Sequence, residues 1–302
     1  MPYIKTRDGT DLYVKDWGSG RPVVLIHGWP LSSDSWDAQA MALAESGFRA
    51  IAYDRRGFGR SSQPFTGYDY DTLSDDLADV LEATGAQDAT LIGFSMGGGE
   101  VARYMSRHGG KGVVGAGLIS SVVPYMPQTD DNPHGAPVDQ LTGIVDGIKA
   151  DRYGFFATFF KQFFGVGFIS SPVSNETLDW AQQQMSMAGL KPILACAESF
   201  AFTDFRPDLS AFRVPTLIVH GTADKTVPID PTGRAAAAAI GQSQLVEYDG
   251  APHALTLTES DRFTRDLLTF LGHRPAVDVP GTVEEEVQRE QFLHPQLAPI
   301  VP

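Results

Sequence analysis

The chain has 302 residues, of which 42% are hydrophobic and 20% charged, as in ordinary globular proteins with a sizeable core. Its formal net charge of −14 argues against nucleic acid and anionic membranes as partners, because phosphates would be repelled. The N-terminus lacks an apolar signal-peptide segment, and no stretch reaches the about 18 apolar residues of a membrane span. We therefore expect a cytoplasmic protein that acts on a neutral or cationic small molecule.

The sequence contains one cysteine, Cys196, so an intrachain disulfide is excluded. Its neighbours Ile193, Leu194 and Ala195 are apolar and indicate a buried thiol. Because a nucleophilic cysteine needs an exposed, electropositive environment, we do not expect Cys196 to be catalytic.

Strand and helix patterns alternate along the first 120 residues and predict a mostly parallel sheet with helices on both faces. The expected elements are a hairpin turning at Asp8–Gly9, strands at 22–26, 48–53, 88–92 and 113–120, and helices at 35–46, at 72–83 and after residue 98.

The alternation stops between residues 122 and 207, where prolines are frequent and phenylalanines crowd the segment 155–164. We interpret 122–207 as a helical cap inserted into a core domain of residues 1–121 and 208–272. The core pattern resumes with strands at 215–220 and 245–248 and ends in a helix at 257–271.

The last segment, 273–302, has five prolines and the acidic run 284–286, and it would bury little by itself. Two interpretations stay open: a flexible extension, or a segment that lies over a neighbouring subunit.

A Gly-Phe-Ser-Met-Gly motif at 93–97 lies between a buried strand and a helix. In this context the motif indicates a nucleophile, because the sharp turn holds the Ser95 hydroxyl clear of the sheet edge. The flanking glycines remove the Cβ atoms that would clash in so tight a turn. We therefore predict Ser95 as a catalytic nucleophile.

A serine nucleophile needs a histidine base. Among seven histidines, His253 follows the last strand and so lies at the same sheet edge as Ser95. His220 ends an apolar strand and is better explained as structural, and His27 lies in the loop after an early strand. The others lack comparable strand-end placement: His108, His134, His273 and His294.

The histidine in turn needs an acid, and Asp224 follows the strand that ends near residue 219 by a short turn. The order Ser95, Asp224, His253 is the order of an α/β-hydrolase triad. Asp249 is a rival acid that more simply shapes the turn before His253, and Asp54 is followed by arginines that favour an ion pair.

Acyl transfer also needs two donors for the developing oxyanion. The backbone N–H of Met96 becomes free at the turn, and the loop at 27–30 supplies Trp29 as the second donor. Because both groups belong to the backbone, the side chains of Trp29 and Met96 are available as pocket walls.

Five segments of the sequence together resemble the cofactor-free bacterial haloperoxidases (perhydrolases) and arylesterases, a branch of the α/β-hydrolase superfamily. The resemblance covers about residues 3–272, and the tail departs from it, because many relatives stop near residue 272. The segments are 27–30 (HGWP), 54–61 (DRRGFGRS), 93–104 (GFSMGGGEVARY), 203–208 (TDFRPD) and 220–224 (HGTAD).

This resemblance implies an α/β fold with a mostly parallel eight-stranded sheet and a small helical cap. It also implies a Ser95–Asp224–His253 triad, oxyanion donors at Trp29 and Met96, and neither metal nor haem. Members hydrolyse short acyl and aryl esters through an acyl-enzyme, and many use hydrogen peroxide in place of water to release a peracid. Relatives assemble as homo-oligomers, as trimers or hexamers.

Phenylalanines recur every four residues in 155–164, which places them on one broad helix face. We favour packing of the cap onto the core as their main role, with Phe159 and Phe163 joining Trp29 around the substrate.

Serine at position 95 argues against haloalkane dehalogenases and epoxide hydrolases of this fold, which attack with aspartate. A lactamase or amidase, or a C–C hydrolase, would use the same triad. A non-catalytic ligand-binding scaffold is the hypothesis from another class, and complete catalytic positions count against it.

Overall fold

A computed structural model describes residues 2–168 and 171–272. The predicted tail 273–302 lies outside the described residues. Within them, no helix is both long enough and apolar enough to cross a membrane.

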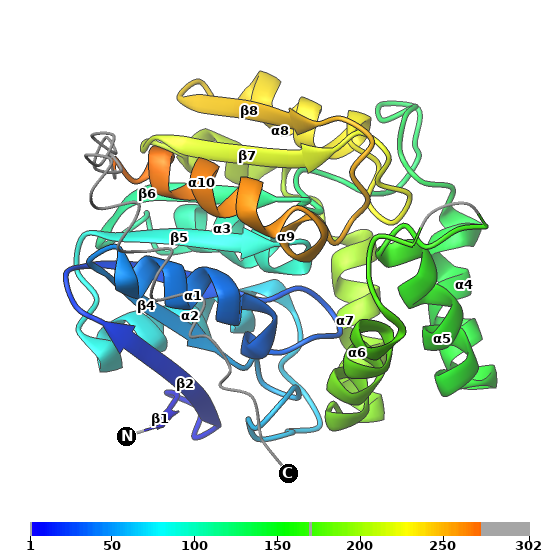
Figure 1. The fold of residues 1–302 in the computed structure, drawn as a ribbon, viewed down its shortest axis with the longest axis horizontal. Coiled ribbons are helices and arrows are strands. Elements are labelled where there is room, and N and C mark those ends of the chain that lie inside the picture. Colours follow the sequence, from blue (N-terminus) through cyan, green and yellow to red (C-terminus); the bar gives the residue numbers. More distant parts are fainter. Residues whose placement is uncertain (1, 169–170, 273–302) are drawn as a thin grey trace, which may run out of the picture.

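One eight-stranded sheet forms the centre of the molecule, in the order β1-β2-β4-β3-β5-β6-β7-β8 (Figure 1). β2 pairs antiparallel with β1 and β4, and the other pairs are parallel, which confirms the predicted N-terminal hairpin and the mostly parallel sheet. The strands are β1 Tyr3–Lys5, β2 Asp11–Gly18, β3 Arg21–Ile26, β4 Phe48–Tyr53, β5 Ala89–Phe94, β6 Val113–Ile119, β7 Thr216–Gly221 and β8 Ser243–Tyr248.

The central strands have continuous apolar sequences, because helices cover both faces of the sheet there. Every residue of β5 and of β7 is buried. Helices α1, α9 and α10 pack on one face, and α2, α3 and α8 pack on the other (Figure 1). These helices are α1 Asp37–Glu45, α2 Tyr70–Thr84, α3 Met96–Arg107, α8 Ala235–Ala239, α9 Leu255–Thr258 and α10 Ser260–Phe270.

Local signals set the ends of α2. The Asp69 side chain accepts a hydrogen bond from the Thr72 amide at the N-terminus, and Gly85 ends the helix with a left-handed φ of 63°. The helix predicted at 257–271 is instead two helices, because Glu259, with φ −121° and ψ 32°, leaves the helical conformation between α9 and α10.

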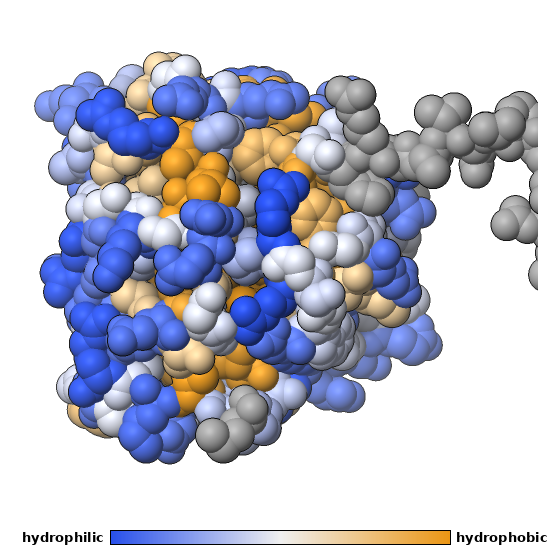
Figure 2. Space-filling view, turned by 90° about the vertical axis from the view of Figure 1, so that its left-hand side faces the viewer, coloured by the Kyte–Doolittle hydropathy of each residue, from blue (hydrophilic) through white to orange (hydrophobic). Residues whose placement is uncertain are grey.

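Four helices form a cap beyond the carboxyl ends of the strands, on the right of Figure 1. They all fall between β6 and β7, inside the predicted insertion 122–207: α4 Val138–Ala150, α5 Arg152–Phe163, α6 Asn175–Met187 and α7 Leu190–Phe202. The buried phenylalanines of α5 support the expected packing role of the aromatic segment. The face of the molecule turned away from the cap is largely hydrophilic, with smaller apolar areas between charged side chains (Figure 2).

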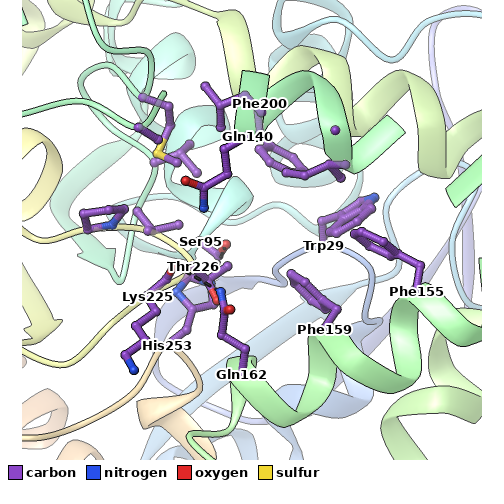
Figure 3. A pocket seen from close by; sticks show the side chains of 18 of the residues that line it. Trp29, Ser95, Gln140, Phe155, Phe159, Gln162, Phe200, Lys225, Thr226 and His253 are labelled. Atoms are coloured by element: carbon purple, nitrogen blue, oxygen red, sulfur yellow. Dashed lines mark hydrogen bonds between the residues drawn. The ribbon is translucent and has the colours of Figure 1, made fainter. Parts of the chain in front are cut away.

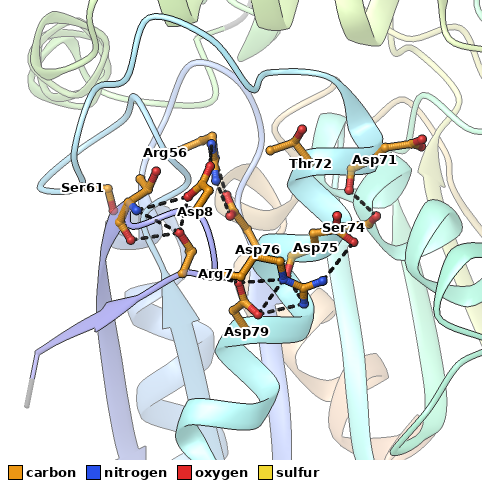
Figure 4. Close-up of polar contacts among 12 residues, drawn as sticks. Arg7, Asp8, Arg56, Ser61, Asp71, Thr72, Ser74, Asp75, Asp76 and Asp79 are labelled. Carbon is orange, nitrogen blue, oxygen red and sulfur yellow. Dashed lines mark hydrogen bonds and ion pairs between the residues drawn. The ribbon is translucent and has the colours of Figure 1, made fainter.

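A buried ion pair fastens the loop after β4 to α2 and to the hairpin (Figure 4). The Arg56 guanidinium donates to Asp76 at 2.5 and 2.6 Å and to Asp8 at 2.8 Å. Arg56 and Asp76 are both buried, so the pair attaches the Arg56 side chain to α2.

We expect Gly97→Ala to destabilise the protein by about 1–3 kcal/mol, because the new Cβ would lie 2.5 Å from the Ile26 carbonyl oxygen. Gly143→Ala in α4 is the matched control, because its new Cβ would meet nothing within 4 Å. This variant should raise the free energy of unfolding by about 0.5–1 kcal/mol. Urea unfolding measures both changes. A Gly97→Ala midpoint equal to that of the wild type would contradict the close packing.

Candidate active site

Ser95 lies at the turn between β5 and α3 with a φ of 54° and a ψ of −119°. A Cβ at Gly93 would lie 2.4 Å from the Gly97 carbonyl oxygen, so the turn closes too tightly for any residue but glycine there. A non-glycine residue at positive φ is strained, and such strain persists only where the surrounding structure imposes it. The turn therefore presents the Ser95 side chain at the sheet edge, as the motif predicts.

The three residues predicted as a triad come together at this edge. Ser95 Oγ lies 2.9 Å from His253 Nε2, and His253 Nδ1 lies 2.6 Å from Asp224 Oδ2. The residues follow β5, β7 and β8, and all three are buried. Since carboxyl ends of parallel strands share one edge, three distant segments meet in one hydrogen-bonded chain.

The Asp224 carboxylate is held in its ionised form. Its Oδ1 accepts hydrogen bonds from the amides of Thr226 and Val227, at 2.9 and 2.8 Å. Burial raises the pKa of this carboxyl, but the neighbouring His253 and the hydrogen bond from His220 outweigh burial and hold the pKa well below its usual value. A charged Asp224 orients the His253 ring and stabilises an imidazolium.

His220 contributes to the site in a way that its strand pattern does not reveal. Its Nε2 lies 3.3 Å from Asp224 Oδ2 and 2.9 Å from the Val227 carbonyl oxygen, so it contacts the acid as well as the loop. The interpretation of His220 as purely strand-end structure is therefore incomplete. Only the fold of the loop after β7 brings the two side chains together.

The rival residues have other partners. Asp54 accepts hydrogen bonds from Ser33 and Arg60, in agreement with the ion-pair interpretation. Asp249 accepts one from the Thr222 hydroxyl in the turn before His253. Burial raises the pKa of Cys196 to about 12, which supports an inert thiol.

The two backbone amides predicted as oxyanion donors belong to residues near the Ser95 turn in the described part of the chain. Within the described part of the chain, neither the Trp29 amide nor the Met96 amide donates a hydrogen bond. The loop before Trp29 lies against the turn, since a Cβ at Gly28 would be 3.1 Å from Ser95 Cβ. Free N–H groups beside a nucleophile are suited to an oxyanion.

A cavity of about 500 Å³ opens at Ser95 and His253 beneath the cap (Figure 3). One side of it is aromatic, and polar side chains lie on the other. The aromatic wall consists of Trp29, Phe155, Phe159 and Phe200, and the polar residues include Gln140, Gln162, Lys225 and Thr226. The indole Nε1 of Trp29 donates to the Ile193 carbonyl oxygen at 3.1 Å, which ties this wall to α7.

Trp29 and Phe159 line the cavity as expected, but Phe163 does not. The Phe163 ring is fully buried, and its centroid lies 4.9 Å from that of the His253 ring. Its position on α5 turns it toward the core, so it packs behind the histidine. The structure therefore places Phe163, which the sequence analysis predicts to bind substrate, outside the lining of this cavity.

Comparisons with known proteins identify the family. The family model described as alpha/beta hydrolase fold matches residues 21–260. A non-heme chloroperoxidase of Kitasatospora aureofaciens is 43% identical over 90% of this chain and 99% of its own. A bifunctional esterase/perhydrolase of Acinetobacter calcoaceticus is 40% identical over 90% of this chain and 99% of its own.

Solved structures show the same relationship. The bromoperoxidase from Bacillus anthracis superimposes with a TM-score of 0.86 at 42% identity and covers 89% of this chain and 99% of its own. An esterase from Exiguobacterium antarcticum gives a TM-score of 0.85 at 32% identity, over 89% of this chain and 98% of its own. The chain therefore belongs to the α/β-hydrolase family, in the branch that contains the non-haem haloperoxidases and related esterases.

Proposed function

We propose that this protein is a serine carboxylesterase that hydrolyses short-chain acyl or aryl esters and also uses hydrogen peroxide as acyl acceptor. The observation that carries the proposal is the hydrogen-bonded chain from Ser95 through His253 to Asp224, at the inner end of an apolar cavity. A nucleophile, a base and an orienting acid in this geometry are the requirements of acyl transfer.

In the first half-reaction, Ser95 Oγ attacks the ester carbonyl carbon while His253 Nε2 accepts the hydroxyl proton. The carbonyl oxygen becomes an oxyanion, for which the Trp29 and Met96 amides are the proposed donors. His253 then gives its proton to the leaving alcohol or phenol, and the acyl group stays on Ser95.

In the second half-reaction, His253 takes a proton from water, whose oxygen attacks the acyl carbon. The bond to Ser95 Oγ then breaks, His253 returns the proton to Ser95 Oγ, and a carboxylic acid is released. With hydrogen peroxide as the acceptor, the same step releases a peracid, which oxidises halide outside the acyl-transfer chemistry. Relatives named chloroperoxidase and esterase/perhydrolase support both outcomes for one site.

The cytoplasmic location and the trimer or hexamer expected from the sequence stay predictions. Light scattering after gel filtration measures the assembly.

The first experiment compares phenyl acetate, butyrate and octanoate with and without hydrogen peroxide. We expect hydrolysis of the short esters, peracid formation with peroxide, and loss of both in Ser95→Ala, leaving only the residual rate from binding and the oxyanion site. Phenol release and a peracid-specific dye measure the two products. Wild-type activity retained in esterase-free Ser95→Ala would overturn the assignment, and absence of turnover in the wild type would favour a binding scaffold.

Asp224→Asn should lower kcat by roughly 10³–10⁴-fold, because an amide favours the wrong histidine tautomer. Asp249→Asn is the matched control, since Asp249 bonds to the Thr222 hydroxyl in the neighbouring turn and should leave kcat unchanged. Steady-state kinetics on phenyl acetate distinguish the two. A large loss in Asp249→Asn alone would exchange their roles.

Phe159→Ala should raise KM several-fold for phenyl and octanoate esters and much less for ethyl acetate. Its ring lies in the cavity wall, and its centroid is 5.5 Å from that of the Trp29 ring. Full burial of a phenylalanine side chain against an apolar ligand group contributes roughly 1.5–3 kcal/mol at most. Phe168→Ala, at a fully exposed position outside the cavity lining, is the control. Equal KM changes for all three esters would exclude Phe159 from selectivity.

A further inference from the structure

An ion pair without solvent contact lies directly behind the Ser95 turn. Arg55 follows β4, Glu100 is on α3, and their side chains are 1% and 0% exposed. Arg55 Nε donates to Glu100 Oε1 at 2.5 Å, and the Tyr53 hydroxyl donates to Oε2 at 2.6 Å. Burial raises the pKa of Glu100, while Arg55 and the Tyr53 hydroxyl favour its charged form. Burying two charges carries a desolvation penalty of several kcal/mol per ion, and a pair of apolar residues of similar volume would often be at least as stable.

One end of this pair holds the loop that carries Trp29. Arg55 Nη2 donates to the His27 carbonyl oxygen at 2.6 Å, and the Arg55 amide donates to His27 Nε2 at 2.9 Å. Burial and the Arg55 charge lower the pKa of His27 to about 3, so the ring is neutral and its Nε2 accepts. The proton then resides on Nδ1, which donates to the Gly28 carbonyl oxygen at 2.9 Å. Arg55 thus holds both the backbone carbonyl and the ring of His27, which precedes Gly28 and Trp29.

The other end holds the helix that begins with Met96. Glu100 is four residues after Met96 in α3 and therefore lies one turn along the same helix face. The Tyr70 hydroxyl donates to the Met96 carbonyl oxygen at 3.1 Å, which adds a second attachment to the first turn. A shift of the Glu100 carboxylate would move the start of α3, and with it the Met96 amide.

We propose that Arg55 and Glu100 are positioning residues that set the spacing between the Trp29 and Met96 amides. The inference rests on the proposed acyl-transfer function. The two amides come from loops that follow different strands, β3 and β5, and Arg55–Glu100 bridges the two segments behind the reacting atoms. The rigid planar fork of the guanidinium donates to a carboxylate and a carbonyl oxygen at a fixed spacing, which the compact ammonium of lysine does not reproduce.

The test compares Glu100→Gln and Arg55→Lys with Asp76→Asn. Glu100→Gln keeps the shape but removes the charge, and Arg55→Lys keeps the charge but removes the fork. Asp76→Asn is the matched control, because Asp76 pairs with the adjacent Arg56 in an equally buried contact that does not reach the oxyanion loop. Phenyl acetate kinetics give kcat and KM, and inhibition by phenylboronic acid reports the tetrahedral adduct on Ser95.

We expect kcat to fall about 10–100-fold in Glu100→Gln and Arg55→Lys with KM within about threefold, because weakened donors cost less than the 10²–10³-fold of a lost one. The boronic acid Ki should rise by a similar factor in both variants. Asp76→Asn should lower the melting temperature yet keep kcat and Ki. This separation of kcat from stability is the signature of a positioning role.

Two results would contradict the inference. In the first, folded Glu100→Gln and Arg55→Lys keep wild-type kcat and Ki. In the second, Asp76→Asn loses kcat as strongly as they do, which would make the pair an ordinary core contact. If Glu100→Gln fails to fold, Arg55→Lys decides alone. Absence of Ser95-dependent turnover in the wild type would instead overturn the proposed function.

Discussion

The rest of the site depends on the close approach of backbone to backbone around Ser95. Gly93 allows β5 to approach α3, and Gly97 allows α3 to approach β3, so closely that a Cβ at either position would lie within 2.5 Å of a carbonyl oxygen. The strained serine backbone follows from that contact, because the central strand and the helix are both fixed by burial. The turn thus presents Ser95, while His253 and Asp224 come from the loops after β8 and β7.

Buried charged side chains lie in two places near this turn, beside His253 and behind the turn. Asp224 is ionised beside His253, and its hydrogen bonds come from its own loop and from His220. Behind the turn, Arg55 and Glu100 are buried as a pair and reach no cavity lining. In a protein whose net charge is −14, these buried charges are stabilised only by partners placed at hydrogen-bond distance.

The cap determines what the nucleophile meets. Helices α4, α5 and α7 supply almost half of the cavity lining, and the Trp29 indole connects the core loop to α7. The same aromatic segment has two roles, since Phe159 faces the cavity whereas Phe163 supports His253 from behind. Selectivity and stability of the site are therefore combined in one helix, and neighbouring positions on it are not interchangeable.

The order of strands and helices, the serine turn and the three residues Ser95, Asp224 and His253 follow from the sequence alone. Apolar runs and glycine spacing encode them locally, and parallel strands bring their carboxyl ends to one edge. The role of Phe163, the contact of His220 with Asp224 and the break at Glu259 depend on packing between segments far apart in the chain. Periodicity gives the broad face on which a side chain lies, but only the tertiary structure decides whether that side chain meets a cavity, a histidine or the core.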